Sequence, residues 1–348
     1  MRPLIYLIPF IFYALALISF DQSGILSWLP VLYAFLFIPL FELLIKPNAR
    51  NLEKVEEELA LANPLYDYIL YLAVILQYFS LWQFLNVMKG GHSMAVSDIT
   101  GHILAMGVLC GVFGINVAHE LGHRRKKGEQ LLARVMLLSS LYMHFFIEHN
   151  KGHHTHVGTE EDPASAEKGL SIYGFWPRAI IGTHIKAWRI AGKEAAQKGV
   201  RLPLIFNEML LYDLIQIGFV FTIYFFFGSF VLLCFLAAAL IGMLLLEGVN
   251  YIEHYGLRRE KREEGYYERV KAHHSWNSNH ILGRLTLFEL TRHSDHHYQA
   301  SRKYQVLRDI EGSPQMPTGY PGTLLLTLIP PVWFWVMNKK LKRLRFEV

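Results

Sequence analysis

Long apolar runs constrain this chain more than any other feature. An α-helix needs about 20 mostly apolar residues to cross a bilayer. Hydrophobic types make up 52% of the residues and charged types only 18%, and a soluble protein could hardly bury that much apolar surface. We therefore expect an all-α integral membrane protein with six transmembrane helices. The six segments are residues 4–20, 25–45, 65–88, 99–118, 209–227 and 230–251.

The basic residues predict the orientation of these helices. With a cytoplasmic N-terminus, the loops expected outside are residues 21–24, 89–98 and 228–229. Of the 34 Lys and Arg residues, only Lys89 falls in them. That asymmetry follows the positive-inside rule. We expect one membrane-embedded catalytic domain over residues 1–348, whose cytoplasmic helical cap consists of residues 119–208 and 253–348.

Two shorter apolar stretches, residues 131–147 and 324–337, are expected to dip into the membrane or lie at its surface without crossing it. The basic tail at 339–345, with Trp333 and Trp335, is typical of an anchor on anionic lipid. The alternative, that this tail is simply exposed to solvent, fits the sequence equally well. Cys110 and Cys234 lie in apolar runs, and neither a disulfide nor a thiolate metal site is expected.

Histidines are the second constraining feature, because nine of the seventeen fall in four tight groups. Histidines four residues apart share one face of a helix, so both rings reach one metal ion. Neutral imidazole suits iron, zinc and copper. Three or four ligands serve one ion, so nine ligands indicate two ions. The nine are His119 and His123; His149, His153 and His154; His254; and His293, His296 and His297.

Each group also holds a carboxylate beside a histidine, which either orients a ring N–H group, completes the coordination, or is a solvated helix charge. Asn250, together with His274 and Asn279 from the stretch 273–280, is a further candidate for the site. The four carboxylates are Glu120, Glu148, Glu253 and Asp295. We expect ordinary polar roles for His92, His102, His144 and His184, and leave His156, His273 and His280 open.

The histidine groups admit several kinds of protein. His119-Glu-Leu-Gly-His123 matches the HExxH motif of zinc proteases, in which the glutamate is the general base. A protease needs one further ligand, whereas this chain supplies seven more histidines. A metal transporter places ionisable ligands at mid-membrane, and these segments are almost free of them. Two nitrogen-rich ions beside apolar helices favour oxygen activation on an apolar substrate. No flavin, haem or cluster motif is visible, so we expect electrons from a partner.

Five motifs together resemble those of the membrane-bound alkane 1-monooxygenase (alkane hydroxylase) family, over roughly residues 117–300. Membrane desaturases resemble the first and last motifs, but their middle motif has HxxHH spacing where this chain has HxxxHH. Thr291 stands where many members carry glutamine. The motifs are HELGH (119–123), EHNKGHH (148–154), NYIEHYGL (250–257), HSWNSNH (274–280) and LTRHSDHH (290–297).

The resemblance implies a non-haem di-iron site, held by the nine histidines, that uses O₂ to convert medium-to-long-chain n-alkanes into 1-alkanols. It implies rubredoxin as the electron donor, reduced in turn by an NAD(P)H-dependent reductase. It further implies a multi-pass protein of the bacterial inner membrane. The alkane is expected to enter from the lipid bilayer, and no nucleic-acid partner is expected. The xylene/toluene side-chain monooxygenases are close relatives that differ in substrate, and a fatty-acyl desaturase is the next alternative.

Two further features are open to two interpretations each. Arg124–Lys127 (RRKK) either docks an acidic rubredoxin or only enforces topology. The aromatic residues of the second segment either floor an alkane pocket or face lipid and neighbouring helices. They are Trp28, Tyr33, Phe35, Phe37 and Phe41.

Overall fold

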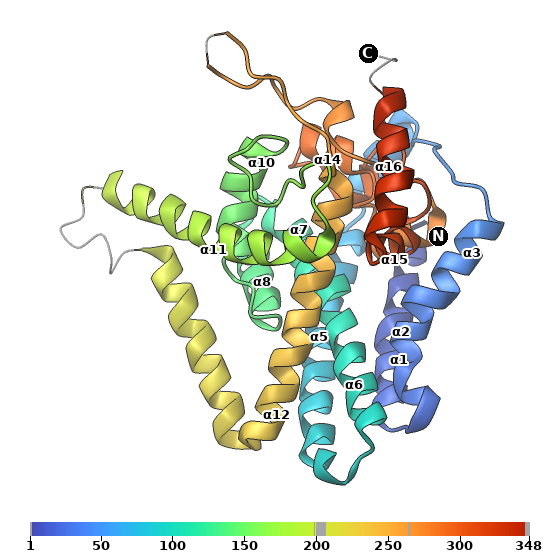
Figure 1. Ribbon diagram of the computed structural model, residues 1–348. Helices are drawn as coiled ribbons and strands as arrows, with labels where there is room; N and C mark the ends of the chain where they lie inside the picture. The colour runs from blue at the N-terminus through green and yellow to red at the C-terminus, as the bar shows by residue number, and fades with distance from the viewer. Residues whose placement is uncertain (1, 198, 200–206, 264, 345–348) are drawn as a thin grey trace.

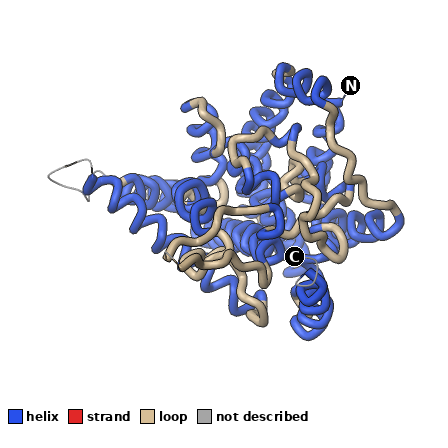
Figure 2. The backbone as a smooth tube through the Cα atoms, turned by 90° about the horizontal axis from the view of Figure 1, so that it is seen from above, coloured by secondary structure: helices blue, strands red, loops and turns tan. Residues whose placement is uncertain are grey.

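The computed structural model describes residues 2–197, 199, 207–263 and 265–344. These residues form helices and loops. Two isolated β-bridges occur among the loops, and they pair Lys261 with Tyr267 and Asn277 with Gln315. Figure 2 shows the same composition from above, with loops gathered over the centre of the helices. The prediction of an all-α fold is confirmed.

Five helices of the described chain are long and apolar enough to cross a membrane, and they stand side by side in Figure 1. The last, α12, contains both of the final predicted segments and folds back at Gly228, whose φ of 85° suits glycine. The count of six spans therefore stays a prediction. The five helices are Arg2–Phe20 (η1 and α1), Gly24–Leu44 (η2, α2, η3 and α3), Leu65–Lys89 (α5), Val96–Gly122 (α6, η5 and α7) and Glu208–His254 (α12).

Small residues bring α6 and η5 close to the part of α12 that follows Gly228. A Cβ atom placed on Gly242 would lie 2.5 Å from Cβ of Cys110, so only glycine fits there. Close packing through small residues is typical of membrane helices. It fixes α7, which continues α6 through η5 (Cys110–Ile115), beside the end of α12.

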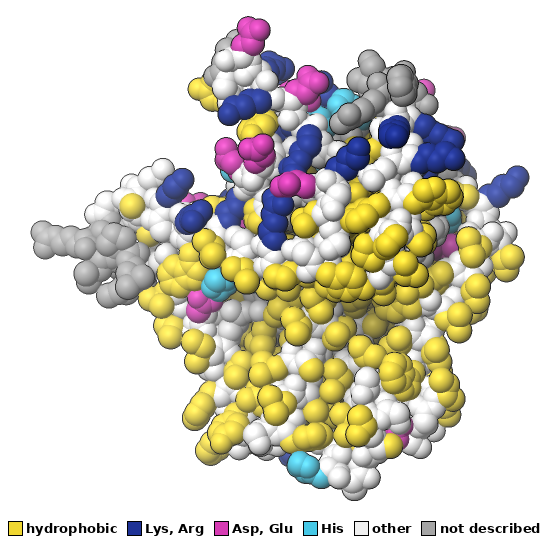
Figure 3. Space-filling view, viewed as in Figure 1, with side chains coloured by type: hydrophobic (Ala, Val, Ile, Leu, Met, Phe, Trp, Pro, Cys, Tyr) yellow, Lys and Arg dark blue, Asp and Glu magenta, His cyan; other side chains and the backbone are white. Residues whose placement is uncertain are grey.

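The remaining elements lie at the histidine-bearing end, which we call the cap. Figure 3 shows charged side chains over this end and apolar ones over the rest of the visible face. In Figure 1 the long helix α11 runs across the spanning helices at the boundary. The elements are α4 (Lys54–Ala62), α8 (Lys127–Leu138), α9 (Phe145–Ile147), η6 (Glu148–His153), α10 (His154–His156), α11 (Ile172–Gln197), η7 (Ala272–His274), α13 (Ile281–Thr286), α14 (His293–Tyr298), η8 (Tyr304–Val306), α15 (Tyr320–Thr327) and α16 (Pro330–Leu344).

The two shorter apolar stretches are not among the helices long enough to span. Residues 131–147 contain the end of α8, a turn and α9, and residues 324–337 are divided between α15 and α16. The expectation that Trp333 anchors the tail at a lipid surface is wrong. Its ring is buried, with its centroid 5.5 Å from that of Tyr251 and 5.2 Å from that of Tyr255. Trp335 is 72% exposed. Within the predicted cap, residues 198, 200–206, 264 and 345–348 lie outside the described residues.

Candidate metal centre

The nine predicted histidines converge from four segments into two clusters, and within each cluster one ligand atom of every ring lies within 4.8 Å of the others. We call them the five-histidine cluster and the four-histidine cluster. The first consists of His119, His123, His149, His154 and His296. The second consists of His153, His254, His293 and His297.

Local helix geometry decides which histidine joins which cluster. Segment η6 is a π-helix, in which hydrogen bonds join residues five apart. His149 therefore lies beside His154, with 3.0 Å between their Nε2 atoms, while His153 points into the other cluster. The expected pairing of His149 with His153 at one ion is wrong for this reason. On α14, His293 and His297 share a face, and His296 lies on the side of the five-histidine cluster.

The Nε2 atoms of the five-histidine cluster are spaced as ligands of one ion would be. Nε2 of His119 lies 2.9 Å from that of His296 and 3.2 Å from that of His123. Nε2 of His154 lies 3.1 Å from that of His296. Two nitrogens that bind one ion at about 2.1 Å and at right angles lie about 3.0 Å apart. The spacing therefore fits a metal ion.

The four-histidine cluster has the same spacing, with 3.2 Å between Nε2 of His293 and His254 and 2.9 Å between Nε2 of His293 and His297. Nδ1 of His153 donates to the carboxylate of Asp162 at 2.9 Å. Nε2 of His153 is buried and has no partner among the described residues. A carboxylate on one ring nitrogen leaves the other with its lone pair free for a metal, so this ring also fits.

Glu253 brings a second carboxylate to the four-histidine cluster. Its Oε2 lies 3.2 Å from Nε2 of His293, and its Oε1 accepts from the Tyr320 hydroxyl at 2.9 Å. Glu253 therefore lies beside the four-histidine cluster, through its contact with His293.

Burial keeps most of these rings neutral, which is the form that binds metals. It lowers the pKa of His123 to about 3, with the charges of His153 and Arg124 acting in the same direction. Burial and neighbouring rings likewise lower the pKa of His149, His154, His293, His296 and His297. Burial alone would also lower the pKa of His153, but the Asp162 carboxylate outweighs it and raises that pKa.

The other three predicted carboxylates contact no histidine of either cluster. Glu120 pairs with Arg124 at 2.6 Å and accepts from the Tyr304 N–H group at 3.2 Å, so it is not placed as the general base of a zinc protease. Glu148 lies 3.2 Å from Nζ of Lys186, and burial raises its pKa to about 7. Asp295 accepts from the Arg308 N–H group at 2.9 Å.

The three remaining candidates also lie outside the clusters. The Asn250 amide donates to Glu247 at 3.1 Å, one turn before His254 on α12. His274 lies 3.1 Å from Glu268 in a third group with His273, and its carbonyl oxygen lies 3.5 Å from Nδ1 of His254. The Asn279 amide donates to Asp309 at 2.9 Å.

The histidines that we expected to be ordinary polar residues do not join a cluster. His102 bonds the Ser19 carbonyl oxygen at 2.8 Å, and the His92 ring packs on Phe230 at the opposite end of the bundle. His144 and His184 pack on each other, with 4.9 Å between centroids. Of those left open, His156 bonds the Gly152 carbonyl oxygen, and His280 lies beside Ser278.

Sequence reasoning missed Asp162 and Lys186. Asp162 is fully buried, and Nζ of Lys186 lies 3.7 Å from its carboxylate. Asp162 follows His153 by nine residues, outside any helical spacing. The turn at Gly158, whose φ is 72°, reverses the chain between them. An acidic residue followed by proline after such a turn was the only local signal.

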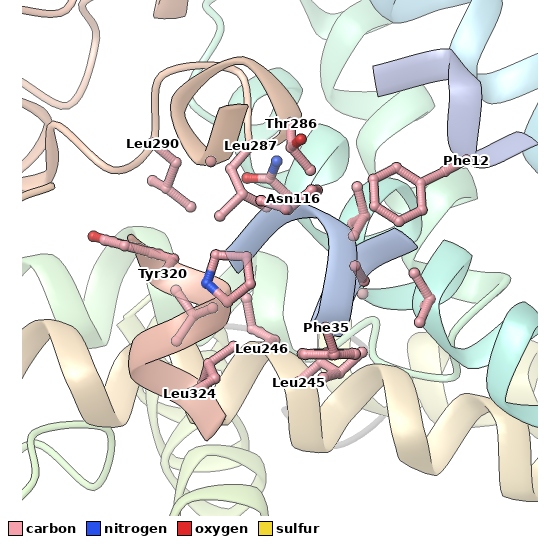
Figure 4. Close-up of a pocket in the computed structure, with 18 residues that line it drawn as sticks. Phe12, Phe35, Asn116, Leu245, Leu246, Thr286, Leu287, Leu290, Tyr320 and Leu324 are labelled. Carbon is pink, nitrogen blue, oxygen red and sulfur yellow. The ribbon is translucent and has the colours of Figure 1, made fainter. Parts of the chain in front are cut away.

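Two apolar pockets lie among the membrane helices, and none of the nine histidines lines either of them. The inner pocket has a volume of about 60 Å³ and includes Asn116 and Tyr320 in its lining (Figure 4). The outer pocket, of about 320 Å³, lies between α2, α6, α11, α12 and α15. They share the lining residues Phe35, Val108, Leu245 and Leu324.

Of the five aromatic residues whose role the sequence left open, one lines a pocket. Phe35 is the only member of that set among the described residues that line these two pockets. Phe37 is 51% exposed, and Trp28 packs against Gly101. Phe12, from the first helix, lines the inner pocket instead.

The basic run at 124–127 is divided in the structure. Arg124 is buried between Glu120 and Asp67, 2.6 and 3.3 Å away, so it cannot belong to a docking surface. Arg125, Lys126 and Lys127 are exposed directly after His123.

Known proteins match this chain over most of its length. The family model described as fatty acid desaturase matches residues 99–323. "Alkane 1-monooxygenase 1" of Pseudomonas aeruginosa is 44% identical over 70% of this chain and 63% of its own length. "Alkane 1-monooxygenase 2" of the same organism is 37% identical over 92% of this chain and 86% of its own. The "Xylene/toluene monooxygenase hydroxylase component" of Pseudomonas putida is 29% identical over 70% of this chain and 64% of its own.

The motifs, the two clusters and the matched relatives agree with one another. The desaturase description fits an all-helical membrane protein with histidine motifs, and the relatives of highest identity share one name. The chain covers slightly less than two thirds of the first relative and most of the second. It belongs to the alkane 1-monooxygenase family, within the wider fatty acid desaturase family.

Proposed function

We propose that this chain hydroxylates the terminal methyl group of medium-to-long-chain n-alkanes with O₂, at a di-iron site held by the nine histidines. The observation that carries the proposal is the convergence of nine histidines beside an apolar pocket, whose lining includes residues next to the clusters but none of the nine histidines. Asn116 of its lining lies three residues before His119 on α7. Tyr320 of its lining donates to Glu253, which contacts His293.

The chemistry requires both metal and confinement. When bound, two irons supply O₂ activation and attack on an unactivated C–H bond, with one oxygen atom entering the alcohol and the other leaving as water. The residues of this chain supply the position. A chain that enters through the outer pocket can extend its methyl end into the inner pocket, beside Asn116. Its apolar lining excludes water from the reacting carbon.

The partners follow from the same proposal. Two electrons per turnover come from rubredoxin, reduced by an NAD(P)H-dependent reductase. The exposed residues Arg125, Lys126 and Lys127 follow His123 directly and suit an acidic donor. The positive-inside pattern supports a bacterial inner-membrane protein with the clusters on the cytoplasmic side. The alkane enters from the bilayer through the outer pocket.

A side-chain monooxygenase of methylated aromatics is the second candidate, because one relative carries that name at 29% identity. The relatives of higher identity carry the alkane 1-monooxygenase name, which favours a linear chain. Oxidation of p-xylene at a higher kcat/KM than octane would favour the second candidate instead.

The test is iron content together with product identity. We expect two irons per purified full-length chain and rubredoxin-dependent conversion of octane to 1-octanol. Val108→Trp fills the segment that both pockets share, so it should lower octane turnover more than 10-fold with iron content unchanged. Leu131→Trp, at a position that is 59% exposed on α8, is the matched control. Bound zinc with proteolytic activity, or one ion per chain, would refute the proposal.

A further inference from the structure

Asn116 places a carboxamide in the otherwise apolar lining of the inner pocket. The side chain is 4% exposed, and its Nδ2 has no hydrogen-bond partner among the described residues. A buried amide that lacks a partner is unfavourable, because it has lost its hydrogen bonds to water. The structure therefore requires a reason for an amide at a position where leucine or valine would pack equally well.

A second polar group lies at the same end of the pocket. Thr286 lines the same pocket and is drawn near Asn116 in Figure 4, while leucine and phenylalanine side chains make up most of the other labelled lining. Tyr320 also lines the pocket, but its hydroxyl points away from it in Figure 4 and donates to Glu253 at 2.9 Å. The amide and the threonine hydroxyl thus form a small polar end on an apolar tube.

An alkane cannot use this polar end, since it offers neither a donor nor an acceptor. A primary alcohol offers both, on its terminal carbon, behind an apolar chain. We propose that the inner pocket is also a binding site for primary alcohols, with the alcohol oxygen accepting from Nδ2 of Asn116 and its hydroxyl donating to Thr286. The inference rests on the proposed function, because it identifies the product of that reaction as the ligand.

The position of Asn116 agrees with this role. Residues three apart on a helix share a face, so Asn116 lies one turn from His119 of the five-histidine cluster. Of the polar residues in the pocket lining, Asn116 therefore stands nearest in the chain to a cluster histidine. The 1-alkanol then competes with the next alkane for the same apolar lining, and turnover slows as product accumulates.

Equilibrium binding tests the inference. Iron-loaded full-length protein in nanodiscs, without rubredoxin or reductant, does not turn over, so labelled 1-octanol and labelled octane can be compared, with empty nanodiscs subtracted. Asn116→Leu should weaken 1-octanol binding about 5- to 10-fold, the value of one lost hydrogen bond. Octane binding should change less than twofold. Thr286→Val should weaken 1-octanol by a smaller factor in the same direction.

Val112→Ala is the control, since it removes apolar lining alone and should weaken both ligands to the same extent. Iron content and thermal unfolding of each variant report whether it folds, and Thr286→Val serves if Asn116→Leu does not. Equal weakening of octane and 1-octanol by Asn116→Leu would overturn the inference, and so would no change in either, which would indicate an amide paired with water.

The two proposals fail separately. Rubredoxin-dependent hydroxylation of octane by the unaltered protein is measured in parallel. Selective 1-octanol binding without hydroxylation would leave the alcohol site standing and refute the proposed function. Hydroxylation without selective binding would do the reverse.

Discussion

The two histidine clusters are built partly from the same segments, but their surroundings differ. Among the described residues, no carboxylate contacts a ring of the five-histidine cluster, and His123 and His154 are half-buried. The four-histidine cluster is fully buried, and carboxylates reach two of its rings, Asp162 at His153 and Glu253 at His293. One site thus offers five ring nitrogens, two of them on half-buried histidines, and the other offers four buried ring nitrogens with two carboxyl groups beside them.

This difference predicts unequal ions. Negative charge beside a metal ion favours its more highly charged state, and a carboxylate that holds a ring N–H group makes the imidazole a stronger donor. The ion in the four-histidine cluster should therefore be the more easily oxidised of the two. The five-histidine cluster, closer to the exposed residues Arg125–Lys127, is the better point of electron entry.

Ligand removal should give the largest effect. His297→Ala leaves three imidazoles in its cluster, whereas His123→Ala leaves four. We expect activity to fall at least about 100-fold in both variants. The reason is that loss of a residue that only hydrogen-bonds a metal ligand already lowers metal affinity or activity about 10- to 100-fold. Iron content should fall towards one per chain in His297→Ala and less in His123→Ala.

His92→Ala, at the far end of the bundle against Phe230, is the control and should keep iron and activity. Equal loss of iron from His297→Ala and His123→Ala would show that the number of remaining nitrogens does not decide retention.

Asp162→Asn should give the next largest effect. It removes the negative charge behind His153 but keeps the shape, and should lower iron affinity or activity about 10- to 100-fold. Mössbauer spectra should change for one iron and not the other, with partial recovery in Asp162→Glu.

Asp295→Asn is the matched comparison, because its carboxylate bonds Arg308 and contacts no histidine. It should lower the unfolding temperature without changing the spectra. Asp162 contacts a ring of the four-histidine cluster only, so Asp162→Asn should change one iron signal. A change in both signals would contradict this expectation.

Charge reversal at Arg125, Lys126 and Lys127 should have a smaller effect, confined to the electron donor. Steering by exposed charges raises association rates by about 10-fold or more at low salt. The triple change to glutamate should raise the KM for rubredoxin by about that factor, less so at high ionic strength, with iron content unchanged. Lys339→Glu with Lys342→Glu, exposed on α16, is the control. A larger effect of Arg258→Glu with Arg269→Glu would move the entry point towards the four-histidine cluster.

Acid should have the smallest effect, on stability. The pKa of His123 is about 3 in the folded metal-free chain, because of burial, and near 6.5 when unfolded. The contribution of neutral His123 to the free energy of unfolding is fully present above pH 6.5. It is lost as the pH falls from 6.5 towards 3, because over this range the unfolded chain binds a proton at His123 and the folded chain does not.

Between pH 7.5 and 5.5, one such ring lowers the free energy of unfolding by about 1.4 kcal/mol. The metal-free unfolding temperature should fall over this interval, and iron should protect against the fall. His153, whose pKa is raised beside Asp162, should act in the opposite direction, so Asp162→Asn should steepen the dependence. An acid dependence that iron does not change would place its origin elsewhere, for example at His144, whose pKa burial lowers to about 3.

The sequence predicted the parts of this molecule that depend on local spacing. Apolar runs indicated the membrane helices, and the short intervals between histidines indicated eight members of the clusters, whereas His254 stood alone within the motif NYIEHYGL. Contacts between distant segments were beyond it. Glu120 and Asp295 stand beside histidines in sequence, yet their side chains turn towards Arg124 and Arg308. Asp162 reaches His153 only because the chain reverses at Gly158. The lack of a hydrogen-bond partner for the Asn116 amide among the described residues is evident only in the structure, where the side chain is buried in the pocket lining.

The π-helical turn at Glu148–His153 has a consequence for how two catalytic lineages are related. A π-turn accommodates one residue more than an α-turn, so rings spaced as HxxxHH present themselves much as rings spaced HxxHH do on an ordinary helix. The extra residue is absorbed within the turn, and both metal pockets stay intact. Deleting Asn150 or Lys151 would give this chain the HxxHH spacing, and both clusters should form only if the π-turn then becomes an ordinary α-helical turn.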